Sequence, residues 1–201
     1  MTSESKILTE GRAAEVLARA VEVRLPPLLE SLTEEELLGQ IPRVELRDVY
    51  WDELEVGQWA AVRVRVTWKW ILLFAMISGD YNPIHVDPQF AAGVRAFGGK
   101  NIAHGALSNA FLSGVGGVHL LGGGIYLREK GAMKFHRAVK AGSELVAYSE
   151  VAAKFTEEIG GKERYFVELD SRIYLVEGES LELAVSAPSV VGVLRKSRES
   201  A

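Results

Sequence analysis

Residues 74–87 read Phe-Ala-Met-Ile-Ser-Gly-Asp-Tyr-Asn-Pro-Ile-His-Val-Asp, a stretch that brings Asp80, Asn82 and His85 close together. A largely apolar run precedes it, a Ser-Gly pair interrupts that run, and Pro83 biases the residue before it toward an extended backbone. The pattern predicts a short exposed bend, anchored on one side by a buried segment. A carboxylate and a histidine on one rigid bend suit a reaction that needs both a proton acceptor and a proton donor.

The same residues also suit a simple turn. Asp and Asn are common turn formers, and an Asp-x-Asn-Pro string is often only an Asx turn. A single histidine is more often packed or solvated than catalytic. The balance changes with a second segment downstream, residues 104–117, which reads His-Gly-Ala-Leu-Ser-Asn-Ala-Phe-Leu-Ser-Gly-Val-Gly-Gly.

Together the two segments resemble the hydratase-2 signature of MaoC-like dehydratases and R-specific enoyl-CoA hydratases. The first carries Phe-Ala-x-x-Ser-Gly-Asp-x-Asn-Pro-x-His-x-Asp and the second carries Ala-His-Gly-x-Leu, in the order and spacing of that signature. The resemblance spans the chain from Glu53 to Val193. It implies reversible syn addition of water across the 2,3 double bond of an enoyl thioester, which gives the (R)-3-hydroxyacyl thioester without a cofactor.

The resemblance also implies roles for the matching residues. Asp80 matches the base that holds and activates the water, and His85 matches the group that orients this water and serves as acid. Gly105 would offer its backbone N–H to the thioester oxygen, because unpaired N–H groups and the helix dipole favour negative charge at a helix start. Asn82 would orient His85 or the loop, and Ser113 matches a serine that supports the site geometry.

Simpler explanations stay open for several of these residues. Asn82 can close the turn alone, Ser113 can be a small packing residue, and His104 can cap the start of its helix. Asp87 is expected to begin the helix that follows it. Two other functions also remain: a hotdog thioesterase, and a noncatalytic subunit of a heteromeric dehydratase. Neither explains why Asp80 and His85 are both intact.

Composition narrows the class of protein. The chain has 201 residues and a net charge of −4, which argues against nonspecific binding to nucleic acid or to a membrane surface. It has no cysteine, so disulfides and thiol nucleophiles are excluded. No apolar run has the length of a membrane span, and the N-terminus does not resemble a secretory signal. We therefore expect a soluble, cytoplasmic protein. The histidines (85, 104, 119 and 136) are too scattered to suggest a metal site.

The expected fold is α+β. Alternation over residues 59–66 predicts a strand, Thr67 can cap a helix ending at Ser78, and residues 103–121 predict a helix that is apolar nearly all round and hence enclosed on most sides. Four long strands are expected afterwards, in an antiparallel meander over Ile125–Arg137, Glu144–Phe155, Glu163–Val176 and Ser180–Leu194, with Pro188 bending the last. This order is that of a single hotdog fold, an antiparallel sheet wrapped around a central helix, which the resemblance also implies.

The chain is expected to divide into an N-terminal helical extension, residues 1–50, and a MaoC-like hotdog domain, residues 51–201. Residues 10–25 predict one helix, and Thr33 opens a second, short one that Gly39 ends. The resemblance implies an acyl-CoA or acyl carrier protein thioester as substrate. It also implies at least a homodimer, since a single hotdog sheet leaves an edge strand that invites pairing.

Overall fold

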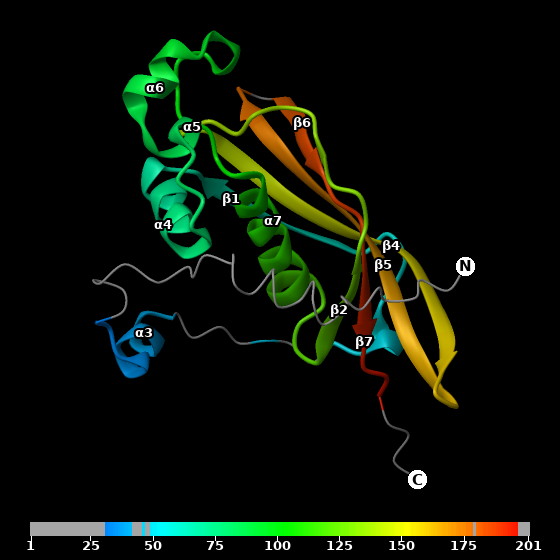
Figure 1. Cartoon of the computed structure of the whole chain (residues 1–201). Coiled ribbons are helices and arrows are strands. Elements are labelled where there is room, and N and C mark those ends of the chain that lie inside the picture. Colours follow the sequence, from blue (N-terminus) through cyan, green and yellow to red (C-terminus); the bar gives the residue numbers. More distant parts are fainter. Residues whose placement is uncertain (1–30, 42–45, 47–48, 179, 197–201) are drawn as a thin grey trace, which may run out of the picture.

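The structure is a computed structural model that describes residues 31–41, 46, 49–178 and 180–196 (Figure 1). The helices are α3 (Glu34–Gln40), α4 (Trp68–Ser78), α5 (Pro83–Val86), α6 (Pro88–Gly93) and α7 (Gly105–Gly114). The strands are β1 (Trp59–Arg65), β2 (Ile125–Lys130), β3 (Lys134–Phe135), β4 (Glu144–Ile159), β5 (Lys162–Glu177), β6 (Ser180–Ser186) and β7 (Ser189–Val193).

The strands form one 7-stranded sheet in the order β1-β4-β5-β6-β3, with β7 paired to both β5 and β2. All of these pairings are antiparallel. Helix α7 crosses one face of the sheet, and α4, α5 and α6 lie together beside it (Figure 1). The predicted antiparallel sheet around a central helix is therefore confirmed. The predicted meander is only partly right, because β1 is inserted beside β4 and β2 pairs with β7.

Two of the expected long strands are each divided in two, and the two breaks pack against each other. The first expected strand stops at Gly131 and the last is interrupted at Pro188. The Gly131 N–H donates to the Pro188 carbonyl at 2.9 Å. A Cβ at position 131 would lie 2.9 Å from the Pro188 ring, so glycine is needed for this contact. The predicted bend at Pro188 is confirmed, and the unbroken strand over Ile125–Arg137 was wrong.

The core lies between α7 and the sheet. Leu107, Leu112 and Val115 from the central helix region pack with Leu145 of β4 and Ile173 of β5 in one buried cluster. Strand β1 follows the predicted alternation, with its even-numbered residues turned toward this cluster and its odd-numbered ones exposed. Burial of large apolar side chains at roughly 25 cal/mol per Å² makes this interface the main stabilising contact of α7.

The central helix is enclosed on most sides and exposes one narrow side. α7 ends at Gly114, and a π-helical segment, Val115–Leu120, continues it. Its large apolar residues face the sheet, but a stripe of small residues on the other side is exposed: Ala106, Ala110, Ser113 and Gly114. The expectation of enclosure on most sides is therefore confirmed, with this stripe as the exposed side. Alanine, serine and glycine expose little apolar area, so exposure of this stripe to water costs little free energy.

Of the N-terminal predictions, the helix over residues 10–25 lies outside the described residues. The second helix is α3, and its predicted capping box is confirmed by reciprocal hydrogen bonds between Thr33 and Glu36. Gly39 does not end it, because the helix continues to Gln40. In the described part of the chain, no helix is long and apolar enough to cross a membrane.

Candidate active site

The bend after α4 has the predicted form. Ile71 and Ala75 bury one side of α4, and Gly79 ends the helix in the left-handed conformation, with φ at 72°. The Asp80 carboxylate then accepts a hydrogen bond from the Asn82 N–H at 3.2 Å. The Asn82 side-chain oxygen accepts from the Ile84 N–H, also at 3.2 Å, and so caps α5. Asn82 therefore holds the bend together and begins the helix that carries His85.

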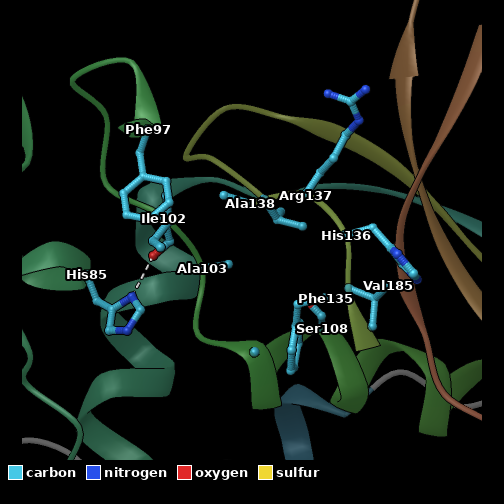
Figure 2. A pocket seen from close by; sticks show the side chains of 12 residues that line it. His85, Phe97, Ile102, Ala103, Ser108, Phe135, His136, Arg137, Ala138 and Val185 are labelled. Atoms are coloured by element: carbon cyan, nitrogen blue, oxygen red, sulfur yellow. Dashed lines mark hydrogen bonds between the residues drawn. The ribbon is translucent and has the colours of Figure 1, made fainter. Parts of the chain in front are cut away.

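The His85 ring is oriented by the backbone. Its Nδ1 lies 2.8 Å from the Ile102 carbonyl oxygen (Figure 2). A carbonyl can only accept, so Nδ1 carries the proton of the neutral ring and Nε2 keeps a lone pair. His85 also lines a cavity of about 450 Å³. Its Nε2 is thus the ring atom left to exchange a proton with a bound molecule.

His104 lies directly against His85. Its Nε2 is 2.9 Å from the Asp80 carbonyl oxygen, which makes Nε2 the donor, and its ring stacks on that of His85. The residue is buried, and this burial is the main reason that the pKa of His104 falls below its ordinary value. His104 occupies the position before α7, but its side chain forms no cap hydrogen bond. The expected capping role was therefore wrong, and the ring instead supports the bend and His85.

The carboxylate and the two imidazoles form one cluster. Their ligand-type atoms lie within 4.8 Å of one another. Two hydrogen bonds of about 2.8 Å can span that separation, so one water molecule can contact Asp80 and His85 together. The histidines were expected to be too scattered to suggest a metal site, yet His85 and His104 come together with Asp80. The two rings are stacked, so the lone pairs in their planes do not converge on one point. The cluster therefore suits proton transfer better than shared coordination of one metal ion.

Gly105 places the start of α7 in the same cavity. It is the first residue of the helix, so its N–H is among those without an acceptor inside the helix. Ser108, one turn further along, is buried and also lines the cavity. Sequence reasoning missed Ser108 and His136, which lines the cavity too and contacts Ser186 at 3.1 Å. Helical periodicity from Gly105 would have pointed to Ser108.

Phe135 of β3 packs against Gly105. A Cβ at position 105 would lie 2.6 Å from the tip of the Phe135 ring, closer than real contacts allow. Figure 2 shows this ring beside Ser108 on the cavity wall. A methyl group at this position would therefore have to displace the exposed Phe135 ring, a contact to add to the reason expected from the sequence.

Ser113 is not brought together with the other predicted residues. It lines a second cavity of about 240 Å³, which shares no lining residue with the first. His85 and Gly105 line the first cavity, and Asp80, whose side chain is 53% exposed, lies in the cluster with His85.

Comparisons with known proteins agree with this geometry. A family model described as a MaoC like domain matches residues 56–168. An (R)-specific enoyl-CoA hydratase from Aeromonas caviae is 37% identical over 139 residues, which are 69% of this chain and 94% of that protein. A 3-hydroxybutyryl-CoA dehydratase from Methylorubrum extorquens is 35% identical over 114 residues, 56% of this chain and 70% of that protein.

Solved structures give the same result. The (R)-hydratase from A. caviae involved in PHA biosynthesis superposes with a TM-score of 0.61 at 33% identity, over 70% of this chain and 97% of that one. An unliganded R-hydratase from Pseudomonas aeruginosa has a TM-score of 0.64 at 28% identity, over 74% of this chain and 88% of that one.

Proposed function

We propose, starting from the fact that the chain belongs to the MaoC-like domain family, that it is an enoyl-CoA hydratase. It adds water reversibly to a trans-2-enoyl-CoA and forms the (R)-3-hydroxyacyl-CoA. The observation that carries this proposal is the cluster of Asp80 and His85 beside a cavity. Gly105, the first residue of α7, lines that cavity. A base, an acid and an oxyanion donor are the groups that this reaction requires.

The reaction begins with a water molecule held between Asp80 and His85. As the water oxygen attacks C3 of the substrate, the Asp80 carboxylate takes one of its protons. Negative charge develops on the thioester oxygen, where the Gly105 N–H donates a hydrogen bond. The lone pair of His85 Nε2 takes up a proton from solvent before this step, and that proton passes to C2 and completes the addition. Solvent then returns both residues to their starting protonation states, so no cofactor is consumed.

The supporting residues act through position. The His104 ring stacks on the His85 ring, and the Ile102 carbonyl accepts a hydrogen bond from His85 Nδ1. Asn82 caps the start of α5. Each contact restricts the rotation of a group that must meet the substrate. Groups with such preorganised geometry contribute on the order of 10²–10⁴-fold each when they transfer protons.

A polar recess next to the catalytic cavity suits the carrier end of the substrate. The two share Phe97, His136, Arg137 and Ala138, and Lys140 lines the recess. The Arg137 guanidinium is already paired with Glu182 at 3.0 Å. Lys140 is therefore the better candidate for a contact with a phosphate of the coenzyme.

The working unit in this proposal is at least a homodimer. β1 ends the sheet, so its outer edge carries unpaired backbone groups among the described residues. The exposed small-residue stripe of α7 is a second surface that another copy of the chain would cover. Small side chains allow two helices to approach closely.

The proposed function is tested by hydration of crotonyl-CoA with the purified chain, followed as loss of the enoyl absorbance. We expect turnover, and we expect the product to be oxidised by an (R)-specific 3-hydroxyacyl-CoA dehydrogenase. The absence of turnover, or a product used by the (S)-specific enzyme instead, contradicts the proposal.

A further inference from the structure

The second cavity lies at the far end of α7 from Gly105. The end of the helix, the π-helical segment and strands β2, β5 and β7 enclose it. Gly116 and Gly117 line it without side chains, and a Cβ there would make ordinary van der Waals contact with Leu169 at 3.5 Å and Ile125 at 3.9 Å. Leucine and valine side chains form much of its wall.

An irregularity in β2 turns a lysine toward this cavity. The pairing between β2 and β7 shifts between Leu127 and Glu129, so the alternation of side chains slips by one residue. Ile125, Leu127 and Lys130 consequently share the face that lines the cavity, and Lys130 pairs with Ser189 on β7. Without the shift, Glu129 would take the place of Lys130.

The Lys130 ammonium group lacks a negative partner. Among the described residues, no carboxylate lies within ion-pair distance of its ammonium group, and burial alone lowers the pKa of Lys130. The Asn109 side-chain oxygen is buried without a hydrogen-bond partner. Ser113, Ser171, Ser189 and Tyr126 also line the cavity, and the Ser171 hydroxyl lies 2.8 Å from that of Ser149. A partly buried charge without a partner is costly, and a bound anion removes that cost.

We propose that the second cavity binds a short aliphatic carboxylate. The Lys130 ammonium pairs with the carboxylate group, the serine hydroxyls donate to its oxygens, and the leucine and valine wall contacts the methylene groups. Two sources share this chemistry. One is the distal carboxylate of a dicarboxylic enoyl thioester, an alternative that rests on the proposed function. The other is a free dicarboxylate that binds independently of the reaction.

The substrate source fits the placement of the two cavities along one helix, α7. Gly105 and Ser113 lie about 12 Å apart along α7 at 1.5 Å per residue, a distance within reach of an extended acyl chain. The first test therefore uses pairs of trans-2-enoyl-CoAs of equal chain length, one ending in a methyl group and the other in a carboxylate. The second test measures binding of free glutarate to the full chain by calorimetry.

Three variants sharpen both tests. Lys130→Met removes the charge and keeps the length, and Lys130→Arg keeps the charge. Lys134→Met is the matched control, because Lys134 is an exposed lysine on β3 that does not line the cavity. If the carboxylate belongs to the substrate, Lys130→Met lowers kcat/KM for the carboxylate-ended substrates roughly 10- to 100-fold and leaves the methyl-ended ones unchanged. Lys130→Arg retains most of the activity.

If the carboxylate is free, the wild-type chain binds glutarate and Lys130→Met does not, with equal kinetics on both substrate series. The proposal is overturned if Lys130→Met alters neither measurement, or if Lys134→Met produces the same loss. Hydration of crotonyl-CoA by the wild-type chain is measured alongside. Its failure would refute the proposed hydratase function but leave the glutarate result to decide the binding site.

Discussion

The rings of His85 and His104 are stacked, with centroids 3.8 Å apart and planes inclined by 27°. Each ring also donates one N–H to a backbone carbonyl, His85 to Ile102 and His104 to Asp80. The second histidine thus links the carbonyl of the proposed base to the ring of the proposed acid. It does not itself line the cavity, which makes it a positioning residue.

Loss of the His104 ring should lower kcat more than it raises KM. In His104→Leu, both the stacking surface and the donor to Asp80 are lost, and we expect kcat to fall at least tenfold, since a loosely held acid or base transfers protons poorly. His104→Gln keeps an N–H donor near the same place and should recover part of the loss. Steady-state kinetics on crotonyl-CoA provide the measurement. Equal kcat values for the two variants would contradict a role for this hydrogen bond.

Stability should fall as the pH drops below the ordinary pKa of histidine. Burial lowers the pKa of His104 below 6.5; the hydrogen bond to the Asp80 carbonyl and the Asp80 charge oppose this shift, and the His85 charge adds to it. The unfolded chain therefore binds a proton at a higher pH than the folded one. The folded state loses stability from about pH 6.5 down to the lowered value.

Denaturant titrations of the wild type and His104→Gln at about pH 7.5 and pH 5.5 measure this effect. The advantage of the wild type should shrink at the lower pH, because only the wild type contains this titrating group. A difference that stays constant or grows would contradict the assignment.

Gly105→Ala should reduce kcat/KM at least tenfold. The added methyl group meets the Phe135 ring and crowds the approach to the helix amide. A matched double variant, Gly105→Ala with Phe135→Ala, separates the two effects because it relieves the clash. We expect activity to stay low in the double variant, since removal of an oxyanion donor or of access to it costs about 10²–10³-fold. Full recovery would mean that packing alone requires the glycine.

Ala110→Arg should break the proposed dimer. Ala110 lies in the exposed small-residue stripe of α7, where a long charged side chain would prevent close contact with a second copy. Light scattering of the wild type should give at least twice the 22.0 kDa of one chain, and the variant should give a smaller particle. Glu158→Arg, an exposed change near the β4–β5 turn, is the control. A fully active wild-type monomer would rule the dimer out.

The sequence was most informative where local chemistry decides the structure. The bend at Asp80 follows from Gly79 and Pro83, and the alternation of β1 follows from its valines, so both were predictable. The family resemblance supplied the fold and the grouping of His85 with Gly105. The Asp87 prediction is also confirmed, because its carboxylate caps α6 by accepting from the Gln89 and Phe90 amides.

The remaining features depend on contacts between distant segments. His104 and His85 are far apart in sequence, and only the path of the chain between α5 and α7 stacks them. Ser113 lines the second cavity and not the first, a placement that its spacing from Gly105 did not reveal, so its supporting role stays a prediction. Lys130 faces the second cavity because the pairing of β2 with β7 shifts by one residue. The alternation of apolar and polar residues in the sequence does not reveal that shift.

The central claim is that Asp80 and His85 transfer the protons of hydration, and kcat for crotonyl-CoA in their variants tests it most directly. Asp80→Asn and His85→Gln should each lower kcat by about 10²-fold or more, with unchanged thermal unfolding, because neither side chain lies in the core. Asp87→Asn keeps an oxygen to cap α6 and should stay active. If either Asp80→Asn or His85→Gln keeps more than about a tenth of the wild-type kcat, the role assigned to that residue is wrong.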